Sequence, residues 1–182
     1  MNPKALLEQA PAGKKMHVLD ALSHTELVSL VTDLSGGVDE RWARYRNDPV
    51  RFVTDGLGEQ VWSKQVDILE SVRDNKRTAV PACHAPGKSH IAARAVAWWV
   101  AVHPVNTVRV VTTATTYRQV RNILWPHIRS VVAHSGLPGE VLTTAWHIDG
   151  ITVADGFSPA EHNEAAVQVI HAENLLIVVD EA

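Results

Sequence analysis

The stretch RTAVPACHAPGKSHI, residues 77–91, constrains the fold of this chain more than any other. It joins a short β-prone run, a loop and the start of an apolar helix. The loop ends in Gly87, Lys88 and Ser89 and has the spacing GxxxxGK(S/T), with Ala82 in the place of the first glycine. This spacing is typical of the P-loop, in which backbone N–H groups and a lysine surround phosphate oxygens and a hydroxyl contacts Mg²⁺.

The residues on either side of the loop predict a βαβ unit. We expect a strand at residues 78–80, a helix over residues 91–102 and a second, parallel strand at residues 108–113, joined by a right-handed crossover. A helix that starts near Lys88 directs its positive end at a bound anion. The residues expected to hold the phosphates are Ala82, Cys83, His84, Ala85, Pro86, Gly87, Lys88 and Ser89.

Bulk properties set broad limits on the chain. Its 182 residues suit one domain, or one domain with a small appendage. A net charge of −3 gives no global basic field, although a local basic stripe remains open. The single cysteine, Cys83, excludes an intrachain disulfide. No apolar run approaches the roughly 18 residues of a membrane span, so we expect a cytoplasmic protein without membrane contact.

The N-terminal residues 1–48 predict a helical arm ahead of an α/β domain at residues 49–182. Apolar residues recur at helical spacing between residues 16 and 34, and Ser23 and Thr25 indicate a helix start at Glu26. Residues 39–47 predict a short charged helix that packs beneath the domain.

An amphipathic helix is predicted over residues 61–72, directly before the P-loop. It carries Gln65, whose amide has the donor and acceptor needed to contact an adenine edge. An ordinary surface glutamine is the other interpretation, and position alone does not decide between the two.

Three further elements follow the second strand. A helix is predicted over residues 115–134, and its Arg118, Arg121 and Arg129 suit either a DNA backbone or a solvated face. Asp149-Gly150 predicts a β-hairpin between residues 141–148 and 151–154. A short helix is expected over residues 159–167.

The chain ends in an apolar run and two acids. Residues 175–179 are continuously apolar, which predicts a buried central strand. Asp180 and Glu181 then follow at the carboxyl end of that strand, where open α/β sheets bind ligands. We expect Asp180 to hold Mg²⁺ together with Ser89, and Glu181 to orient or deprotonate an attacking water.

These motifs together resemble the ATPase portion of phage terminase large subunits, the motors that pump double-stranded DNA into empty capsids. The resemblance spans residues 49–182 and rests on the P-loop, the acidic strand end and three short motifs. The short motifs are Trp62-Ser63-Lys64-Gln65, Thr112-Thr113-Ala114-Thr115 with Arg118-Gln119-Val120, and Gly156-Phe157-Ser158.

The resemblance implies a partial P-loop NTPase fold (RecA/ASCE-like), with a mostly parallel sheet flanked by helices, a β-hairpin and an N-terminal helical arm. It implies ATP and Mg²⁺ as cofactors, with Lys88 and Glu181 catalytic, Ser89 and Asp180 at the metal and Gln65 at adenine. It implies double-stranded DNA, a portal protein and a small terminase subunit as partners. When full length, such a motor is expected to form a ring of identical subunits at the procapsid portal in the host cytoplasm.

The sequence departs from the family pattern in three places. Ala82 replaces the first loop glycine, and His84 stands where many terminases carry an arginine. The sequence also stops after Ala182, before the coupling motif and the metal-dependent nuclease domain. We therefore expect exposed apolar surface on the final strand, and poor ATP hydrolysis by this polypeptide alone.

Two other functions remain open. A fragment of a superfamily-two helicase or translocase shares the P-loop, the acidic strand end and the glutamine. An inactive remnant of a terminase gene folds, or binds nucleotide, without turnover. A zinc site is not expected, because Cys83, His84 and His90 lie in or next to the phosphate loop and the other histidines lack ligand spacing.

Overall fold

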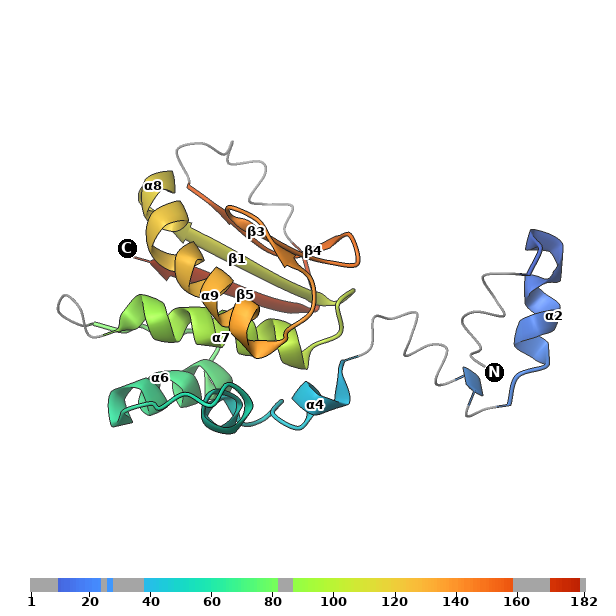
Figure 1. Cartoon of the computed structure of the whole chain (residues 1–182), viewed down its shortest axis with the longest axis horizontal. Coiled ribbons are helices and arrows are strands. Elements are labelled where there is room, and N and C mark those ends of the chain that lie inside the picture. The colour runs from blue at the N-terminus through green and yellow to red at the C-terminus, as the bar shows by residue number, and fades with distance from the viewer. Residues whose placement is uncertain (1–9, 24–25, 28–37, 82–86, 159–170, 181–182) are drawn as a thin grey trace. The chain divides into compact units, whose positions relative to one another are not determined.

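Gly37 divides the chain into two units, Met1–Gly37 and Val38–Ala182. The computed structural model describes residues 10–23, 26–27, 38–81, 87–158 and 171–180 (Figure 1). Residues 38–48, which we expected in the N-terminal arm, belong to the larger unit.

The smaller unit holds the helical turns expected of an arm. The 3-10 helix η1 (Ala12–Lys14) leads into α2 (Lys15–Asp20). The predicted helix start at Glu26 is confirmed, because its backbone N–H donates to the Ser23 hydroxyl at 3.3 Å and its carboxylate accepts from the Ser23 N–H at 2.9 Å. This reciprocal pair is a capping box.

The larger unit is an α/β structure. Its described helices are α4 (Glu40–Ala43), α5 (Pro49–Arg51), the π-helix η2 (Phe52–Gly56), α6 (Ser63–Asp74), α7 (Lys88–Val102), α8 (Tyr117–Gln119), the π-helix η3 (Val120–Leu124) and α9 (Trp125–Ser135). Its described strands are β1 (Val108–Ala114), β2 (Glu140–Val141), β3 (Ala145–Ile148), β4 (Ile151–Phe157) and β5 (Asn174–Asp180). The predicted helices on both sides of the P-loop, α6 and α7, are therefore confirmed. The helix expected over residues 159–167 lies outside the described residues.

The five strands form one mixed sheet in the order β2-β3-β4-β1-β5. The central strand β1 is parallel to both β4 and β5, whereas β3 is antiparallel to β2 and β4. The expectation of a mostly parallel sheet is therefore only partly met. The predicted hairpin is confirmed: β3 and β4 meet at Asp149 and Gly150, whose φ angles of 49° and 78° suit a tight hairpin turn.

Helices cover one face of the sheet (Figure 1). On β1, Val110 and Thr112 face α7 and α9, and the buried Trp125 indole donates to the Thr112 hydroxyl at 2.9 Å. On the other side of α7, an aromatic cluster of Trp42, Tyr45 and Phe52 anchors the start of the unit. Trp98 fixes this cluster by donating to the Tyr45 carbonyl at 2.9 Å. Trp98 is thereby assigned to the core.

The strand predicted at residues 78–80 is wrong, and with it the βαβ unit that it would have opened. Residues 75–81 adopt no strand, and Val80 is 37% exposed. The run is only three residues long and precedes Pro81, which has no N–H for a ladder. The Thr78 hydroxyl instead lies 3.0 Å from that of Ser71 on α6.

Strand β5 lies at one edge of the sheet that the structure describes, so the expectation of a central strand is wrong there. Leu176 and Val178 pack against the helix-covered core, whereas Ile177 and Val179 on the opposite face are 57% and 55% exposed. The expectation of exposed apolar surface on this strand is confirmed.

Candidate functional site

Helix α7 begins directly after a glycine in a left-handed conformation. Gly87 precedes the helix with φ 81° and ψ 24°, in the left-handed region that favours glycine. Its carbonyl accepts from the Ile91 N–H at 3.0 Å, so α7 begins at once and the N–H groups of its first turn lack helical partners. This end of the helix favours an anion.

The structure brings Ser89 and Asp180 together from distant parts of the sequence. The Ser89 hydroxyl donates to the Asp180 carboxylate at 3.3 Å, across 91 residues of sequence. Asp180 occupies the carboxyl end of β5, in register with Ala114 at the end of β1. The first turn of α7 therefore meets the carboxyl edge of the parallel strands, where α/β sheets hold ligands.

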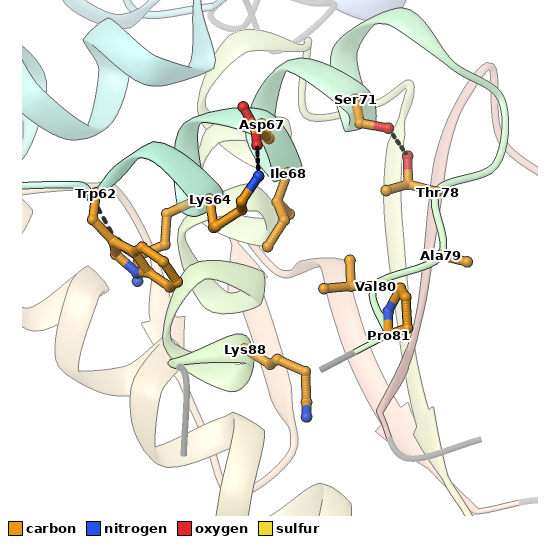
Figure 2. A pocket seen from close by; sticks show the side chains of 11 residues that line it. Trp62, Lys64, Asp67, Ile68, Ser71, Thr78, Ala79, Val80, Pro81 and Lys88 are labelled. Carbon is orange, nitrogen blue, oxygen red and sulfur yellow. Dashed lines mark hydrogen bonds and ion pairs between the residues drawn. The ribbon is translucent and has the colours of Figure 1, made fainter. Parts of the chain in front are cut away.

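Lys88 lines a cavity of about 320 Å³ between α6 and residues 78–81. Its other walls come from both segments: Trp62, Lys64, Gln65, Asp67, Ile68, Ser71, Thr78, Ala79, Val80 and Pro81. Figure 2 shows Ile68 and Val80 on opposite sides of this space, with Lys88 at its lower end. Trp62 is 50% exposed and presents its ring beside the cavity. An apolar pocket with a lysine at one end has the character of a small-molecule site.

Gln65 is buried at the junction of α6 and the loop helix. Only 8% of it is exposed, and its Oε1 accepts from the Trp62 N–H at 3.3 Å. Its Nε2 lies 3.0 Å from where a Cβ on residue 87 would stand. Gln65 is thus no ordinary surface glutamine, and its contact with adenine stays a prediction.

Six of the predicted site residues lie outside the described residues. They are Ala82, Cys83, His84, Ala85, Pro86 and Glu181. The described part of the site therefore consists of Gln65, Gly87, Lys88, Ser89 and Asp180.

A partly buried ion pair beside α7 was not predicted. Arg94 on α7 is 6% exposed and donates through Nε and Nη2 to the two carboxylate oxygens of the half-buried Glu59, at 2.8 and 2.7 Å. These bonds hold the pKa of Glu59 below its usual range. The pair ties the segment that enters α6 to α7. An arginine within the otherwise apolar run of residues 91–102 was the signal that it has an acidic partner.

His90 lies next to this pair. Its Nε2 is 3.4 Å from Glu59, and its ring packs edge-on against His127 at 6.0 Å between centroids. Burial, followed by the charge of Arg94, lowers the pKa of His90. The ring is therefore neutral at pH 7, and Arg94 supplies the positive charge opposite Glu59.

The geometry of Ser89 and Asp180 fits a magnesium ion. Hydroxyl and carboxylate oxygens are the hard ligands that Mg²⁺ prefers, and neighbouring ligands in an octahedron of 2.0–2.1 Å bonds stand about 2.9 Å apart. The observed 3.3 Å needs only a small adjustment. Among the described residues no group of three or more His, Cys, Asp or Glu side chains is placed to hold a metal. Mg²⁺ usually takes one or two protein ligands and completes its shell with water and phosphate, so this too is compatible.

No protein-family model matches this chain, and neither curated proteins nor solved structures give a significant match. In the described part of the chain, no helix is long and apolar enough to cross a membrane.

Proposed function

We propose that this chain binds Mg²⁺ and ATP at the first turn of α7 and belongs to an ATP-hydrolysing motor. The observation that carries the proposal is the 3.3 Å contact between the Ser89 hydroxyl and the Asp180 carboxylate. A P-loop spacing alone occurs by chance, so the contact of its serine with an acid at the end of β5 is a second, independent observation that supports the proposal. A hydroxyl and a carboxylate side by side are compatible with metal-assisted phosphoryl transfer.

Each residue has a definite role in this proposal. The N–H groups after Gly87 and the Lys88 ammonium bind the β- and γ-phosphates, while Ser89 and Asp180 hold the metal. Mg²⁺ neutralises charge that develops on the phosphate oxygens. Glu181, next in sequence to Asp180, orients or deprotonates the attacking water. The cavity beside Lys88, with Gln65 and Trp62 in its wall, receives the base.

The motor that the sequence resembles is the large subunit of a phage terminase, which translocates double-stranded DNA into a procapsid. This assignment rests on the order of the motifs, with the glutamine helix α6 first, then the P-loop helix α7, then β1 and finally the acidic end of β5. The mixed α/β sheet is compatible with it. A portal protein, a small terminase subunit and further copies of the subunit in a ring follow as partners.

A binding assay tests the first step. We expect Mg²⁺-ATP to bind the chain in isothermal titration calorimetry, and Lys88→Ala to weaken binding by at least about tenfold. Lys64→Ala is the matched control, because Lys64 lines the same cavity but pairs with Asp67 at 2.9 Å on the surface of α6. Equal binding by the wild type and by Lys88→Ala would overturn the proposal.

One observation favours a second candidate, a chain that binds nucleotide without turnover. Residues 75–81, which lead into the loop, form no strand, so no ladder fixes this end of the phosphate loop among the described residues. Preorganisation of the loop matters more for the transition state than for binding. ATP binding without Lys88-dependent phosphate release supports this candidate, whereas robust release that Glu181→Gln abolishes supports the motor.

A further inference from the structure

The acidic residues of this chain are distributed unevenly. Between Asp74 and Glu140 there is no aspartate or glutamate, although the whole chain holds 20 and its net charge is −3. The same interval contains eight lysines and arginines: Lys76, Arg77, Lys88, Arg94, Arg109, Arg118, Arg121 and Arg129. Such a block of one charge marks a surface for a partner of the opposite charge unless acids elsewhere neutralise it.

Two of these charges have acidic partners among the described residues. Arg94 pairs with Glu59, and Arg109 pairs with Asp155 at 3.0 Å. The helical segment α8-η3-α9 carries Arg118, Arg121 and Arg129, and none of them forms an ion pair with another described residue. Arg118 and Arg121 are exposed and Arg129 is half-buried, so this segment presents positive charge to solvent.

Two of these arginines share a cavity of about 360 Å³. Arg121, Asn122, Pro126, Arg129 and Thr143 line it. Its polar groups are two guanidinium groups, an amide and a hydroxyl, and its lining holds no carboxylate. All four can donate hydrogen bonds to an anion. Pro126 alone offers an apolar surface, which suits a phosphate group better than a base.

The π-helix η3 brings the two arginines into line. In a regular α-helix, residues eight positions apart point about 80° away from each other. The Trp125 N–H donates to the Val120 carbonyl, five residues back, so this turn takes up one extra residue. With one residue taken up in this way, ideal helix geometry gives an angle of about 20° for eight steps. Both arginines accordingly line the same cavity.

Arg129 is fixed before any ligand arrives. Its Nη1 donates to the Thr143 carbonyl at 2.7 Å, with the Leu142 carbonyl at 3.5 Å. The two carbonyls are neutral, so they orient the guanidinium without neutralising its positive charge. The other N–H groups of the guanidinium can still donate hydrogen bonds. An arginine held in this way loses less side-chain entropy when it binds an anion.

We infer that this cleft binds phosphate groups of a nucleic-acid backbone. The electrostatic argument is independent of the nucleotide site, and the choice of duplex DNA rests on the proposed function. Arg121 and Arg129 contact successive or shared phosphate oxygens, and Arg118 adds charge one turn earlier on the same segment. Recognition is of the backbone and not of the sequence, because the cleft offers no surface for stacking bases.

Fluorescence anisotropy with a short labelled DNA duplex tests the inference at several salt concentrations. We expect Arg121→Ala to weaken binding about fivefold or more at low salt and to reduce the slope of log affinity against log salt by about one. Arg51→Ala is the matched control, because Arg51 is an exposed helical arginine that pairs with Asp55 at 2.9 Å. It should change affinity less than twofold. Arg121→Lys keeps the positive charge, so its slope of log affinity against log salt should be close to that of the wild type.

One further variant and one competition experiment distinguish the possible outcomes. Lys88→Ala should leave duplex binding unchanged, so failure of the nucleotide site and failure of the DNA cleft are distinguishable. Inorganic phosphate should displace the duplex only at concentrations far above that of the DNA. Equal affinity and salt slope for the wild type and Arg121→Ala would overturn the inference, as would full displacement by equimolar phosphate, which would identify a site for single phosphates.

Discussion

The Ser89 hydroxyl donates a hydrogen bond to the Asp180 carboxylate at 3.3 Å and joins the first turn of α7 to the carboxyl end of β5. If Mg²⁺ binds as proposed, both oxygens become its ligands and two metal–oxygen contacts replace this hydrogen bond.

The first prediction follows from that pair. Asp180→Asn keeps the shape of the side chain but removes the charge that attracts Mg²⁺. We expect the affinity for ATP with Mg²⁺ to fall at least about tenfold, because even outer-shell partners of a metal contribute about 10- to 100-fold. Affinity for ATP in excess EDTA should hardly change. Calorimetry under both conditions checks this, and an equal loss in the two would remove Asp180 from the metal site.

A second prediction concerns Gly87. Gly87→Ala places a Cβ at φ 81° and 3.0 Å from Gln65 Nε2, so it suffers both backbone strain and a contact with a buried neighbour. Gly58→Ala is the matched control, because its φ is 70° and a Cβ there meets nothing within 4 Å. Strain alone costs about 1 kcal/mol. We expect urea unfolding to show a larger loss in the free energy of unfolding for Gly87→Ala than for Gly58→Ala. Combining Gln65→Ala with Gly87→Ala should remove this difference. Equal losses would show that Gln65 does not press on the loop.

A third prediction separates two roles of Gln65. A contact with adenine requires Gln65→Ala to lose affinity for ATP while affinity for GTP stays nearly constant. This is the expected result, because Gln65 lines the cavity proposed for the base. Competition of both nucleotides against a fluorescent analogue measures the ratio. Parallel losses for ATP and GTP would instead assign Gln65 to holding Gly87 in place.

The fourth prediction tests the clamp between Arg94 and Glu59. Glu59→Ala leaves Arg94 buried at 6% exposure without its carboxylate partner, which should lower the free energy of unfolding by about 3 kcal/mol. Asp67→Ala breaks the exposed pair with Lys64 and should cost less than about 1 kcal/mol. Urea denaturation of both variants makes the comparison. Losses of similar size would show that burial adds nothing to this ion pair.

A fifth prediction concerns pH. Burial lowers the pKa of His103, whose Nδ1 lies 2.8 Å from the Trp99 carbonyl. Because the folded pKa is below the unfolded value, the stabilisation is complete above the unfolded pKa of about 6.5 and is lost as pH falls toward the folded pKa. The wild type should therefore lose stability between pH 7.5 and pH 5.5, and His103→Gln should lose less. Equal losses of stability in the wild type and in His103→Gln would show that protonation of His103 does not cause the loss.

The sequence predicted the elements whose signals are local. Amphipathic spacing predicted α6, β-branched residues predicted β1, and Asp149-Gly150 predicted the hairpin of β3 and β4. The spacing GKS predicted a helix that starts near Lys88, and the structure starts α7 there. The contact of Ser89 with Asp180 followed from the predicted chemistry, because a loop expected to hold phosphate and metal needs an acid nearby.

Features that depend on distant residues escaped prediction. Residues 78–80 have β-prone side chains, but they form a strand only if another strand offers a free edge to pair with. The neighbouring Pro81 also lacks the N–H that such pairing needs. The position of β5 at the edge of the described sheet is set by the order of the strands, which the apolar character of residues 175–179 does not reveal. The partner of Arg94 lies 35 residues earlier, and no spacing rule connects it to Glu59. The π-turn of η3 has no sequence signature of its own, although it aligns Arg121 with Arg129.

A crystal structure with Mg²⁺ and a non-hydrolysable ATP analogue would show whether nucleotide and metal bind at the first turn of α7. We expect the Lys88 ammonium within hydrogen-bonding distance of the terminal phosphates, with the metal against the side-chain oxygens of Ser89 and Asp180. A nucleotide bound away from the first turn of α7, or a metal that Asp180 does not touch, would contradict the proposed function.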